Sequence, residues 1–185
     1  MRVISGKNRG TKLVAPKGLN TRPTDDRLKE NIFNLIGPID KDAFILDLFA
    51  GSGQIGIEFL SRGAAYATFI EKNFNAVKVI KDNLLKTKNN EQSEVFQEDA
   101  MAYLRRSHDK KFKYVYIDPP YDDKKILTEV FNFIKESDII DIGTWIIIET
   151  VADMFFDDID IYKERIYGAR KVIIAEVNNE SDISR

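Results

Sequence analysis

The stretch from Phe44 to Gly56 constrains the fold of this chain more than any other. Its first five residues are large and apolar except for one acid, Asp47, which is typical of a parallel strand covered on both faces. Glycines follow at positions 51, 53 and 56, the spacing G-x-G-x-x-G. Such a turn lets the backbone approach a ligand without an intervening Cβ atom and begin a helix close to the sheet. Glycine spacing alone also fits a loop that merely needs positive φ, so the rest of the chain must decide.

Segments with strand-like and helix-like patterns alternate along most of the chain. Strand-like runs occupy residues 44–48, 66–70, 93–97, 114–117 and 144–149, and helical patterns cover residues 25–36, the segment ending at Gly63, residues 73–85 before a polar loop at 86–92, and residues 100–105 and 124–135. This alternation predicts a doubly wound α/β fold, with a mostly parallel sheet and helices on both faces. Only Gly168 and Ala169 separate the last two strand-like runs, 159–167 and 171–177. Because two residues are too few for a crossover helix, these runs should form an antiparallel hairpin.

The composition excludes several classes of protein. The chain of 185 residues contains no cysteine and a single histidine, His108, which excludes disulfides, thiol nucleophiles and multi-histidine metal clusters, so we expect no metal. The length suits one domain with a core of its own. No apolar run approaches the roughly 18 residues that a membrane span requires. We therefore expect a cytoplasmic protein without a membrane segment.

Basic residues are concentrated at the N-terminus. Residues 1–24 contain six of them and no acid, a charge of +6, and since the whole chain has a net charge of −2, residues 25–185 carry −8. Two strand-like runs, 2–5 and 11–14, predict a β-hairpin rather than the alternative, a solvated and partly disordered terminus. We interpret residues 1–24 as a basic arm that contacts a polyanion and residues 25–185 as the main domain. The candidate substrate-binding residues are Arg2, Lys7, Arg9, Lys12, Arg22 and Arg27.

Acidic residues directly follow two neighbouring strand-like runs. Glu71 comes after the second run, 20 residues beyond Gly51, where a carboxylate can accept hydrogen bonds from both hydroxyls of a ribose. Asp99, beside Ala100, comes after the third run and is suited to the edge of an adenine. Each acid alone could equally be a helix cap or a solvated charge. In an open α/β sheet, however, ligands bind outside the carboxyl ends of the strands, so the shared location of these acids predicts a nucleotide-like ligand.

The segment Asp118-Pro119-Pro120-Tyr121 follows the strand-like run 114–117. Its two prolines fix φ and lack backbone N–H groups, so this edge offers hydrogen-bond acceptors only. The Asp118 carboxylate and the Pro119 carbonyl can together accept both hydrogens of a planar amino group, and the Tyr121 ring offers a surface on which a base can stack. These four residues are therefore the candidate catalytic residues. A turn that merely ends the strand is the alternative.

These motifs, taken in order, carry a family resemblance. Residues 49–53, Glu71, Asp99 and the segment 118–121 resemble the successive motifs of an S-adenosylmethionine-dependent amino-methyltransferase. Further segments are similar to the RsmD family of bacterial methyltransferases, and the resemblance covers nearly the whole chain. These segments are residues 2–6 with Arg9 and Gly10, residues 21–24 with Arg27, and the pair Tyr167 and Gly168.

The resemblance implies a fold, a cofactor and a substrate. The fold is the Rossmann-like class I methyltransferase fold, with a seven-stranded sheet whose last strand is inserted antiparallel. The cofactor is S-adenosylmethionine, and the substrate is the exocyclic N2 of a guanine in the 16S RNA of the small ribosomal subunit. The methionine part of the cofactor should be bound by Asp47, Phe49, Ala50, Gly51, Ser52 and Gly53. The ribose should be bound by Glu71, the adenine by Asp99 and Ala100, and the target base by Asp118, Pro119 and Tyr121.

Three other functions remain compatible with parts of the sequence. A nicotinamide-dependent dehydrogenase would share the glycine turn and the ribose acid, but it would leave the segment 118–121 and the basic arm unexplained. A non-catalytic RNA-binding module would explain the arm but not the aligned acids. An adenine-N6 methyltransferase acting on DNA or RNA is the nearest alternative, because the same pair of acceptors fits either amino group.

The charge distribution also predicts the form of the substrate. Residues 25–185 repel RNA, so binding should depend on the basic arm, and the chain shows no RRM-like or KH-like sequence with which to read a naked strand. We therefore expect the substrate to be a guanine displayed by a folded, protein-bound ribosomal particle. Separately, we expect the protein to be a monomer. Removal of residues 1–20 should abolish methylation of the particle and leave cofactor binding unchanged.

Overall fold

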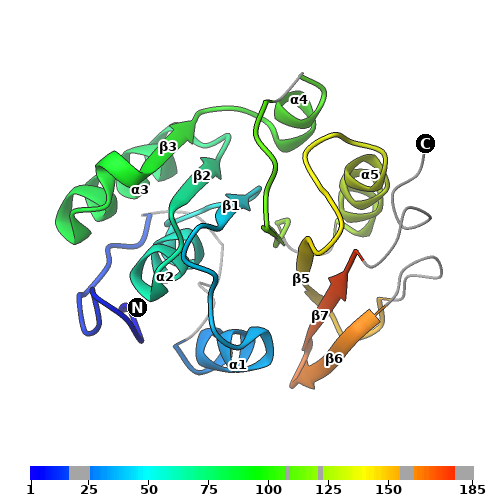
Figure 1. Cartoon of the computed structure of the whole chain (residues 1–185), viewed down its shortest axis with the longest axis horizontal. Coiled ribbons are helices and arrows are strands. Elements are labelled where there is room, and N and C mark those ends of the chain that lie inside the picture. The colour runs from blue at the N-terminus through cyan, green and yellow to red at the C-terminus, as the bar shows by residue number, and fades with distance from the viewer. Residues whose placement is uncertain (17–25, 107–108, 121–122, 155–160, 178–185) are drawn as a thin grey trace.

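The computed structural model describes residues 1–16, 26–106, 109–120, 123–154 and 161–177. These residues contain one seven-stranded sheet (Figure 1). Its strands are β1 (Phe44–Asp47), β2 (Tyr66–Ile70), β3 (Ser93–Phe96), β4 (Tyr114–Ile117), β5 (Trp145–Val151), β6 (Ile161–Tyr167) and β7 (Arg170–Glu176). Their order across the sheet is β3-β2-β1-β4-β5-β7-β6.

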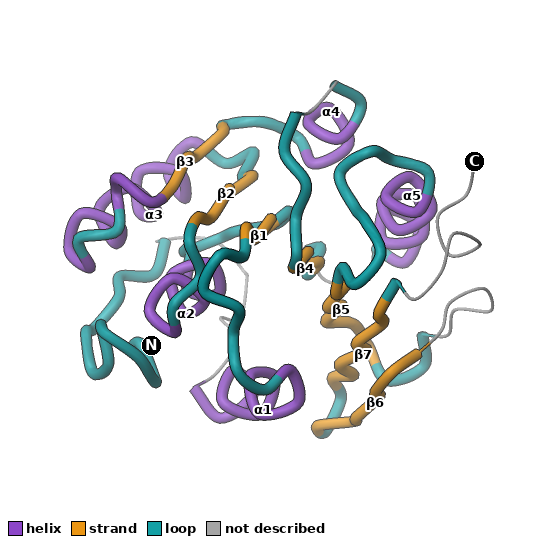
Figure 2. The backbone as a smooth tube through the Cα atoms, in the orientation of Figure 1, coloured by secondary structure: helices purple, strands orange, loops and turns teal. Residues whose placement is uncertain are grey.

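Helices cover both faces of this sheet, as the alternating pattern predicts. They are α1 (Asp26–Ile36), α2 (Gln54–Arg62), α3 (Phe74–Thr87), the 3₁₀ helix η1 (Asn90–Gln92), α4 (Ala100–Leu104) and α5 (Lys124–Lys135). The helices α1, α2 and α3 contribute to one hydrophobic core, and α4 and α5 contribute to a second core on the other face (Figure 2). The predicted doubly wound α/β fold is therefore confirmed.

Parallel pairing ends at β5. The strand β1 pairs in parallel with β2 and β4, and β4 pairs in parallel with β5. The strand β7 then pairs antiparallel with both β5 and β6, so the predicted C-terminal hairpin is confirmed. Because β7 runs against its neighbour, its first residue, Arg170, pairs with the last residue of β5, Val151. Arg170 therefore lies at the edge of the sheet where the parallel strands end.

The helix α3 extends beyond its predicted end. Asn73 caps its first turn as expected, because its Oδ1 accepts hydrogen bonds from the backbone N–H groups of Asn75 and Ala76 at 2.9 and 3.1 Å. The helix then continues to Thr87 and stops at Lys88, which has φ +57°. The predicted polar loop at 86–92 also contains η1. Polarity alone did not distinguish an exposed last helical turn from a loop.

Two glycines of the turn allow close packing on the sheet and on α3. A Cβ atom at Gly56 would lie 2.3 Å from a ring carbon of Phe69 in β2. At Gly53, where φ is +76°, a Cβ atom would lie 3.1 Å from Ile80 in α3. Gly56 therefore lets α2 lie close to the sheet, and Gly53 lets the turn lie close to α3.

Residues 1–16 form an irregular hairpin, called here the N-terminal hairpin, that packs on the main body of the chain (Figure 1). It contains one β-bridge, Arg2 to Lys12, rather than two regular strands. Val3 and Leu13 are buried and belong to the core that α1 and α2 also form. The predicted boundary at residue 24 lies outside the described residues. Residues 1–16 are nevertheless integrated into the same core as the main domain.

The carboxylate of Glu58 in α2 attaches the hairpin to the body. It is fully buried and accepts hydrogen bonds from the backbone N–H groups of Ile4 and Ser5 at 2.8 and 3.0 Å. The backbone N–H of Lys7 also donates to the carbonyl of Ser61, at 2.8 Å. Side chain and backbone of α2 thus fix one strand of the hairpin.

Two cations surround the same carboxylate. The Arg62 Nε lies 2.9 Å from Glu58 Oε1, and the buried Lys29 Nζ lies 3.7 Å from Oε2. Lys29 also donates to the carbonyl of Arg2, at 2.6 Å. Burial lowers the pKa of the Lys29 ammonium, and the Glu58 carboxylate opposes that shift. Loss of this carboxylate would leave Lys29 buried without its counter-ion.

We predict that Glu58→Gln lowers the free energy of unfolding by about 3–5 kcal/mol, the usual loss when one member of a buried ion pair is removed. Urea denaturation followed by circular dichroism measures this change. The matched control is Glu30→Gln on the exposed face of α1, which should change stability by less than about 0.5 kcal/mol. The double variant Lys29→Met, Glu58→Gln should recover part of the loss. A change below about 1 kcal/mol for Glu58→Gln would contradict the role given to this carboxylate.

Candidate active site

A cavity of about 360 Å³ opens at the carboxyl ends of β1, β2 and β4. Its walls include predicted site residues from every segment that the sequence singled out along the sheet edge. These are Asp47, Phe49, Ala50, Gly51, Ser52, Glu71, Asp99, Ala100, Asp118, Pro119 and Pro120. Gly53 packs against Ile80 as described above, and Tyr121 lies outside the described residues. The cavity thus brings together residues that are as much as 73 positions apart, from Asp47 to Pro120.

Glu71 connects the end of β2 to the glycine turn. Its Oε2 accepts a hydrogen bond from the backbone N–H of Gly51 at 2.9 Å, and its Oε1 accepts one from Asn73 at 2.7 Å. Gly51 has φ +55°, a backbone conformation that glycine adopts without strain. Since each carboxylate oxygen has two lone pairs, these contacts orient Glu71 and still leave it able to accept from a ligand hydroxyl.

Asp47 is the most buried acid of the cavity, with 1% of its surface exposed. Its Oδ2 accepts a hydrogen bond from the backbone N–H of Gly56 at 3.2 Å. Burial raises the pKa of Asp47 to about 7, and the neighbouring Glu71 carboxylate raises it further, while the hydrogen bond opposes the shift. A cation in the cavity would therefore interact with a carboxyl group that is ready to ionise near neutral pH.

Asp99 serves as the N-cap of α4. Its Oδ1 accepts hydrogen bonds from the backbone N–H groups of Met101 and Ala102, at 2.9 and 3.4 Å. A helix cap was the alternative role considered for Asp99 from the sequence, and the structure contains this cap. Asp99 and Ala100 also line the cavity, so the capping residue borders the space that a ligand would occupy.

Asp118 shares a guanidinium with a second acid. Arg170 Nη2 lies 3.0 Å from Asp118 Oδ1 and 2.5 Å from Oε1 of Glu149 in β5. The hydroxyl of Tyr116 donates to the other Glu149 oxygen, at 2.6 Å. Burial raises the pKa of Asp118 well above its ordinary value, Glu149 and Asp47 raise it further, and Arg170 opposes the shift. The guanidinium therefore favours the ionised, acceptor form of Asp118.

The sequence reasoning missed Arg170, Glu149 and Tyr116. Tyr116 and Glu149 are buried in strands and read as parts of apolar runs. Arg170 had a usable signal, because an antiparallel last strand must begin at the edge where the parallel strands end. The hairpin alone left open which of its two strands runs against the parallel strands, but the family resemblance implied an inserted antiparallel last strand, which begins at the sheet edge that holds Asp118.

The predicted substrate-binding residues lie outside the cavity walls. Arg9, Lys12 and Arg27 are exposed. Arg2 forms an exposed ion pair with Asp26 at 3.3 Å, and Lys7 donates to Gln92 at 2.6 Å. Arg22 lies outside the described residues. The structure therefore gives these cations surface positions.

Part of the N-terminal hairpin forms a wall of the cavity. Met1, Ala15 and Pro16 line it, and the Ser52 hydroxyl lies 3.3 Å from the sulfur of Met1. Removal of residues 1–20 would take away this wall together with the buried side chain of Val3. The same residues support the cavity and the core, so we now expect this deletion to weaken cofactor binding as well.

Among the described residues, no group of three or more histidines, aspartates and glutamates could hold a metal ion. No helix in the described part of the chain is long and apolar enough to cross a membrane.

The strand order and the acidic cavity at the strand ends define a class I methyltransferase fold. The family model described as Conserved hypothetical protein 95 matches residues 1–176, and the chain belongs to this family. The resemblance to the RsmD family is thereby confirmed.

Relatives and solved structures agree with this assignment. The chain is 39% identical to the putative rRNA methyltransferase YlbH of Bacillus subtilis, over 94% of this chain and 97% of that protein. It is 32% identical to ribosomal RNA small subunit methyltransferase D of Escherichia coli, over 98% of this chain and 93% of that protein. The solved structure of the putative methyltransferase yhhF from Escherichia coli has a TM-score of 0.85 at 31% identity, covering 96% of this chain and 98% of that one.

We predict that Asp47 makes stability depend on pH. Between the ordinary pKa of 3.8 and about 7, folded Asp47 keeps a proton that the unfolded chain has released. The free energy of unfolding should therefore fall as the pH rises through this window, by up to about 1.4 kcal/mol per pH unit. Asp47→Asn, which cannot ionise, should lose this contribution. Urea unfolding of both proteins from pH 4.5 to 7.5 is the measurement, and a difference between them that stays constant with pH would refute the assignment.

Proposed function

We propose that this protein transfers the methyl group of S-adenosylmethionine to the exocyclic N2 of a guanine in small-subunit ribosomal RNA. The observation that carries the proposal is that Asp118 and Pro119 share one cavity with Glu71 and Asp99. A target amino group and a nucleoside-containing cofactor can therefore meet there. The names of the B. subtilis and E. coli relatives support an rRNA substrate.

The cavity fits the cofactor by volume and by chemistry. About 360 Å³ lies within the usual range for sites that bind small molecules. The acids Asp47, Glu71 and Asp99 are suited to a ligand that carries positive charge, ribose hydroxyls and an adenine amino group. Gly51 lets the backbone approach the ligand. We assign the ribose to Glu71, the adenine edge to Asp99 and Ala100, and the methionine part to Asp47 and the turn 49–53.

Bound S-adenosylmethionine supplies an activated methyl group on a positively charged sulfur. The lone pair of guanine N2 is delocalised into the ring, so this nitrogen is a poor nucleophile while its hydrogens lie in the ring plane. The Asp118 carboxylate and the Pro119 carbonyl can accept these hydrogens and hold them out of that plane. Orientation of the amino group and electrostatic complementarity then supply most of the rate.

Arg170 acts on this step through Asp118. Its Nη2 lies 3.0 Å from Oδ1 and so orients the carboxyl group, and its charge opposes the rise in the pKa of Asp118 that burial, Glu149 and Asp47 cause. The raised pKa of Asp118 also suits it to take up the proton that the amino group loses once the nitrogen is methylated. Tyr121 is proposed to stack on the target base.

We predict that Asp118→Ala lowers kcat by ten- to a hundredfold, about 1.4 to 2.7 kcal/mol of barrier, because one of the two acceptors is lost. Cofactor affinity and Tm should stay close to those of the wild type, since Arg170 keeps its contact with Glu149. Transfer from labelled cofactor and calorimetric titration measure these quantities. Asp153→Asn, an exposed change on the loop after β5, is the matched control. An unchanged methylation rate in Asp118→Ala would exclude the acceptor mechanism.

The substrate itself is tested by mass spectrometry of the methylated nucleoside. We expect N2-methylguanosine, and N6-methyladenosine would instead support the adenine alternative. We further propose that the protein works as a monomer in the cytoplasm on an assembled particle. Small-subunit RNA in reconstituted particles should then be methylated at least tenfold faster than the same RNA free in solution, and equal rates would contradict this form of the substrate.

A further inference from the structure

The solvent face of α3 carries an unusual stripe of side chains. Phe74, Lys78, Lys81 and Leu85 follow one another at intervals of four, three and four residues, which places them on one face of a helix with 3.6 residues per turn. Phe74 is 54% exposed and Leu85 is 62% exposed, and both lysines are exposed as well. The opposite face of α3 packs into the core through its own apolar residues. The stripe therefore takes no part in folding the helix onto the sheet.

An aromatic ring and a cation lie together at the start of this stripe. Lys78 Nζ is 4.2 Å from the centroid of the Phe74 ring. A nucleotide offers a flat base and a negative phosphate a few ångströms apart, which are the partners of a ring and an ammonium group. The pair therefore suits a nucleotide better than a purely apolar or a purely anionic ligand.

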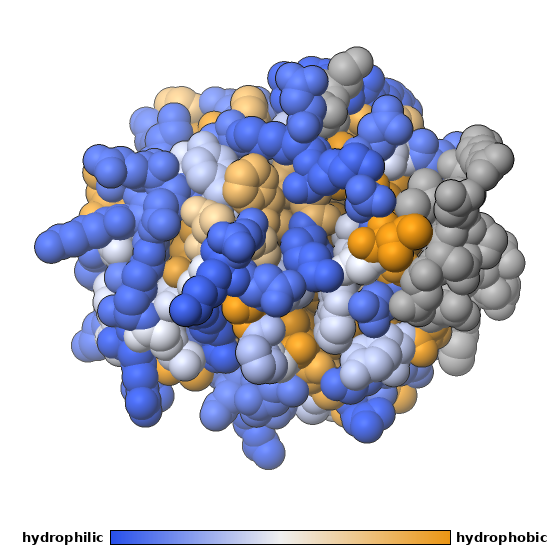
Figure 3. Space-filling view, in the orientation of Figure 1, coloured by the Kyte–Doolittle hydropathy of each residue, from blue (hydrophilic) through white to orange (hydrophobic). Residues whose placement is uncertain are grey.

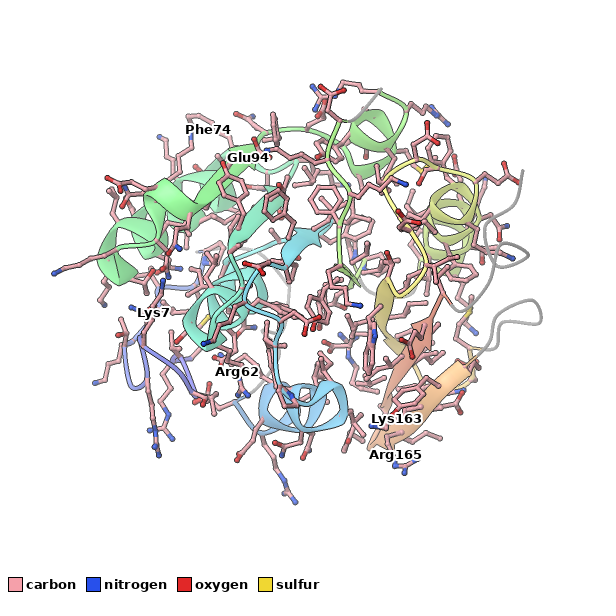
Figure 4. All side chains as sticks on the ribbon, in the orientation of Figure 1. Lys7, Arg62, Phe74, Glu94, Lys163 and Arg165 are labelled. Carbon is pink, nitrogen blue, oxygen red and sulfur yellow. The ribbon has the colours of Figure 1, made fainter. Side chains whose placement is uncertain are left out.

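The stripe runs from the cavity at the strand ends to the N-terminal hairpin. Lys72 and Asn73 line the cavity, and Phe74 is the next residue of the chain. At the other end of α3, the side-chain amide of Asn8 donates to the carbonyl of Thr87 at 2.8 Å, so the N-terminal hairpin lies against the last helical turn. Figure 4 shows Phe74 and Lys7 of the hairpin on the same side of the molecule.

The surface formed by α3 and the N-terminal hairpin is positively charged, whereas residues 25–185 as a whole are negatively charged. Residues 7–16 and 74–92 contain seven basic residues and two acids, a net charge of +5. In Figure 3, hydrophilic side chains dominate the side of the molecule where α3 and the hairpin lie in Figure 1. Because residues 25–185 as a whole carry −8, a polyanion would be directed to this side.

We propose that Phe74, Lys78, Lys81 and Leu85, together called the α3 track, bind a single-stranded segment of the substrate RNA next to the target nucleotide. The lysines contact phosphates, Phe74 stacks on a base, and Leu85 packs against a further nucleotide. The track leads from the cavity to the basic hairpin, so that RNA bound along it reaches both. This inference rests on the proposed function in that the RNA is taken to be the substrate.

The test compares Lys78→Gln, Lys81→Gln with a matched control, Lys41→Gln, Lys125→Gln. Lys41 precedes β1 and Lys125 lies on α5, which covers the other face of the sheet, and both are exposed. Fluorescence anisotropy with a short single-stranded RNA and with small-subunit RNA, at several salt concentrations, gives affinity and salt dependence without any methylation. Calorimetry with S-adenosylmethionine checks that the cavity is intact.

We expect the α3 variant to bind both RNAs at least fivefold more weakly at low salt. Its slope of log affinity against log salt should be smaller by about 1.4, that is about 0.7 for each lysine on single-stranded RNA. Phe74→Ala should weaken binding about fivefold with an unchanged slope, Phe74→Trp should restore it, and the control should behave as the wild type. Cofactor affinity should not change in any of these proteins.

Two results would overturn the proposal. One is an α3 variant that binds RNA like the control. The other comes from repeating the measurement with reconstituted small-subunit particles: if the α3 variant binds the particles more weakly but binds free RNA like the wild type, the partner of the α3 track is an acidic protein and not RNA. Failure of the proposed function would look different. The wild type would then methylate no RNA, but substitutions in the α3 track would still weaken its binding to RNA.

Discussion

Repulsion among closely placed carboxylates, one of them fully buried, is the constraint around which this site is built. Asp47 and Asp118 end neighbouring strands, and Glu71 follows the next strand, so three acids face one cavity in a region of low dielectric. Backbone N–H groups of the glycine turn and the start of α2 bind two of them, and Arg170 binds the third. These contacts stabilise three neighbouring carboxyl groups in one cavity, and a cationic ligand would stabilise their ionised forms further.

The N-terminal hairpin shows how that cavity and the basic surface depend on each other. Glu58 fixes the hairpin on α2 through two backbone N–H groups, and Met1 and Pro16 at its two ends complete the cavity wall. The same sixteen residues carry four of the cations expected to contact RNA. If RNA binds the hairpin as proposed, that binding and the binding of a ligand in the cavity would act on one packed segment, so each event could influence the other.

Much of this arrangement could be predicted from local sequence. The apolar run before Asp47, the glycines after it and the spacing to Glu71 predict a strand, a tight turn and a carboxylate at the next strand end, because period and chain stiffness act over a few residues. The two-residue connection Gly168-Ala169 required an antiparallel hairpin for the same reason. The longer α3 and the single bridge of the N-terminal hairpin were not predicted, since packing against the body decides where such marginal elements end.

The sequence by itself determined the order of strands and helices along the chain, the edge of the sheet that holds the acids, and the family to which the chain belongs. Only the tertiary structure decided which distant groups meet. Arg170 reaches Asp118 across 52 positions, and Glu58 reaches Ile4 across 54. Such contacts depend on how whole strands and helices pack, and no local period or spacing encodes them. For the same physical reason, only the tertiary structure shows that the exposed face of α3 lies between the cavity and the N-terminal hairpin.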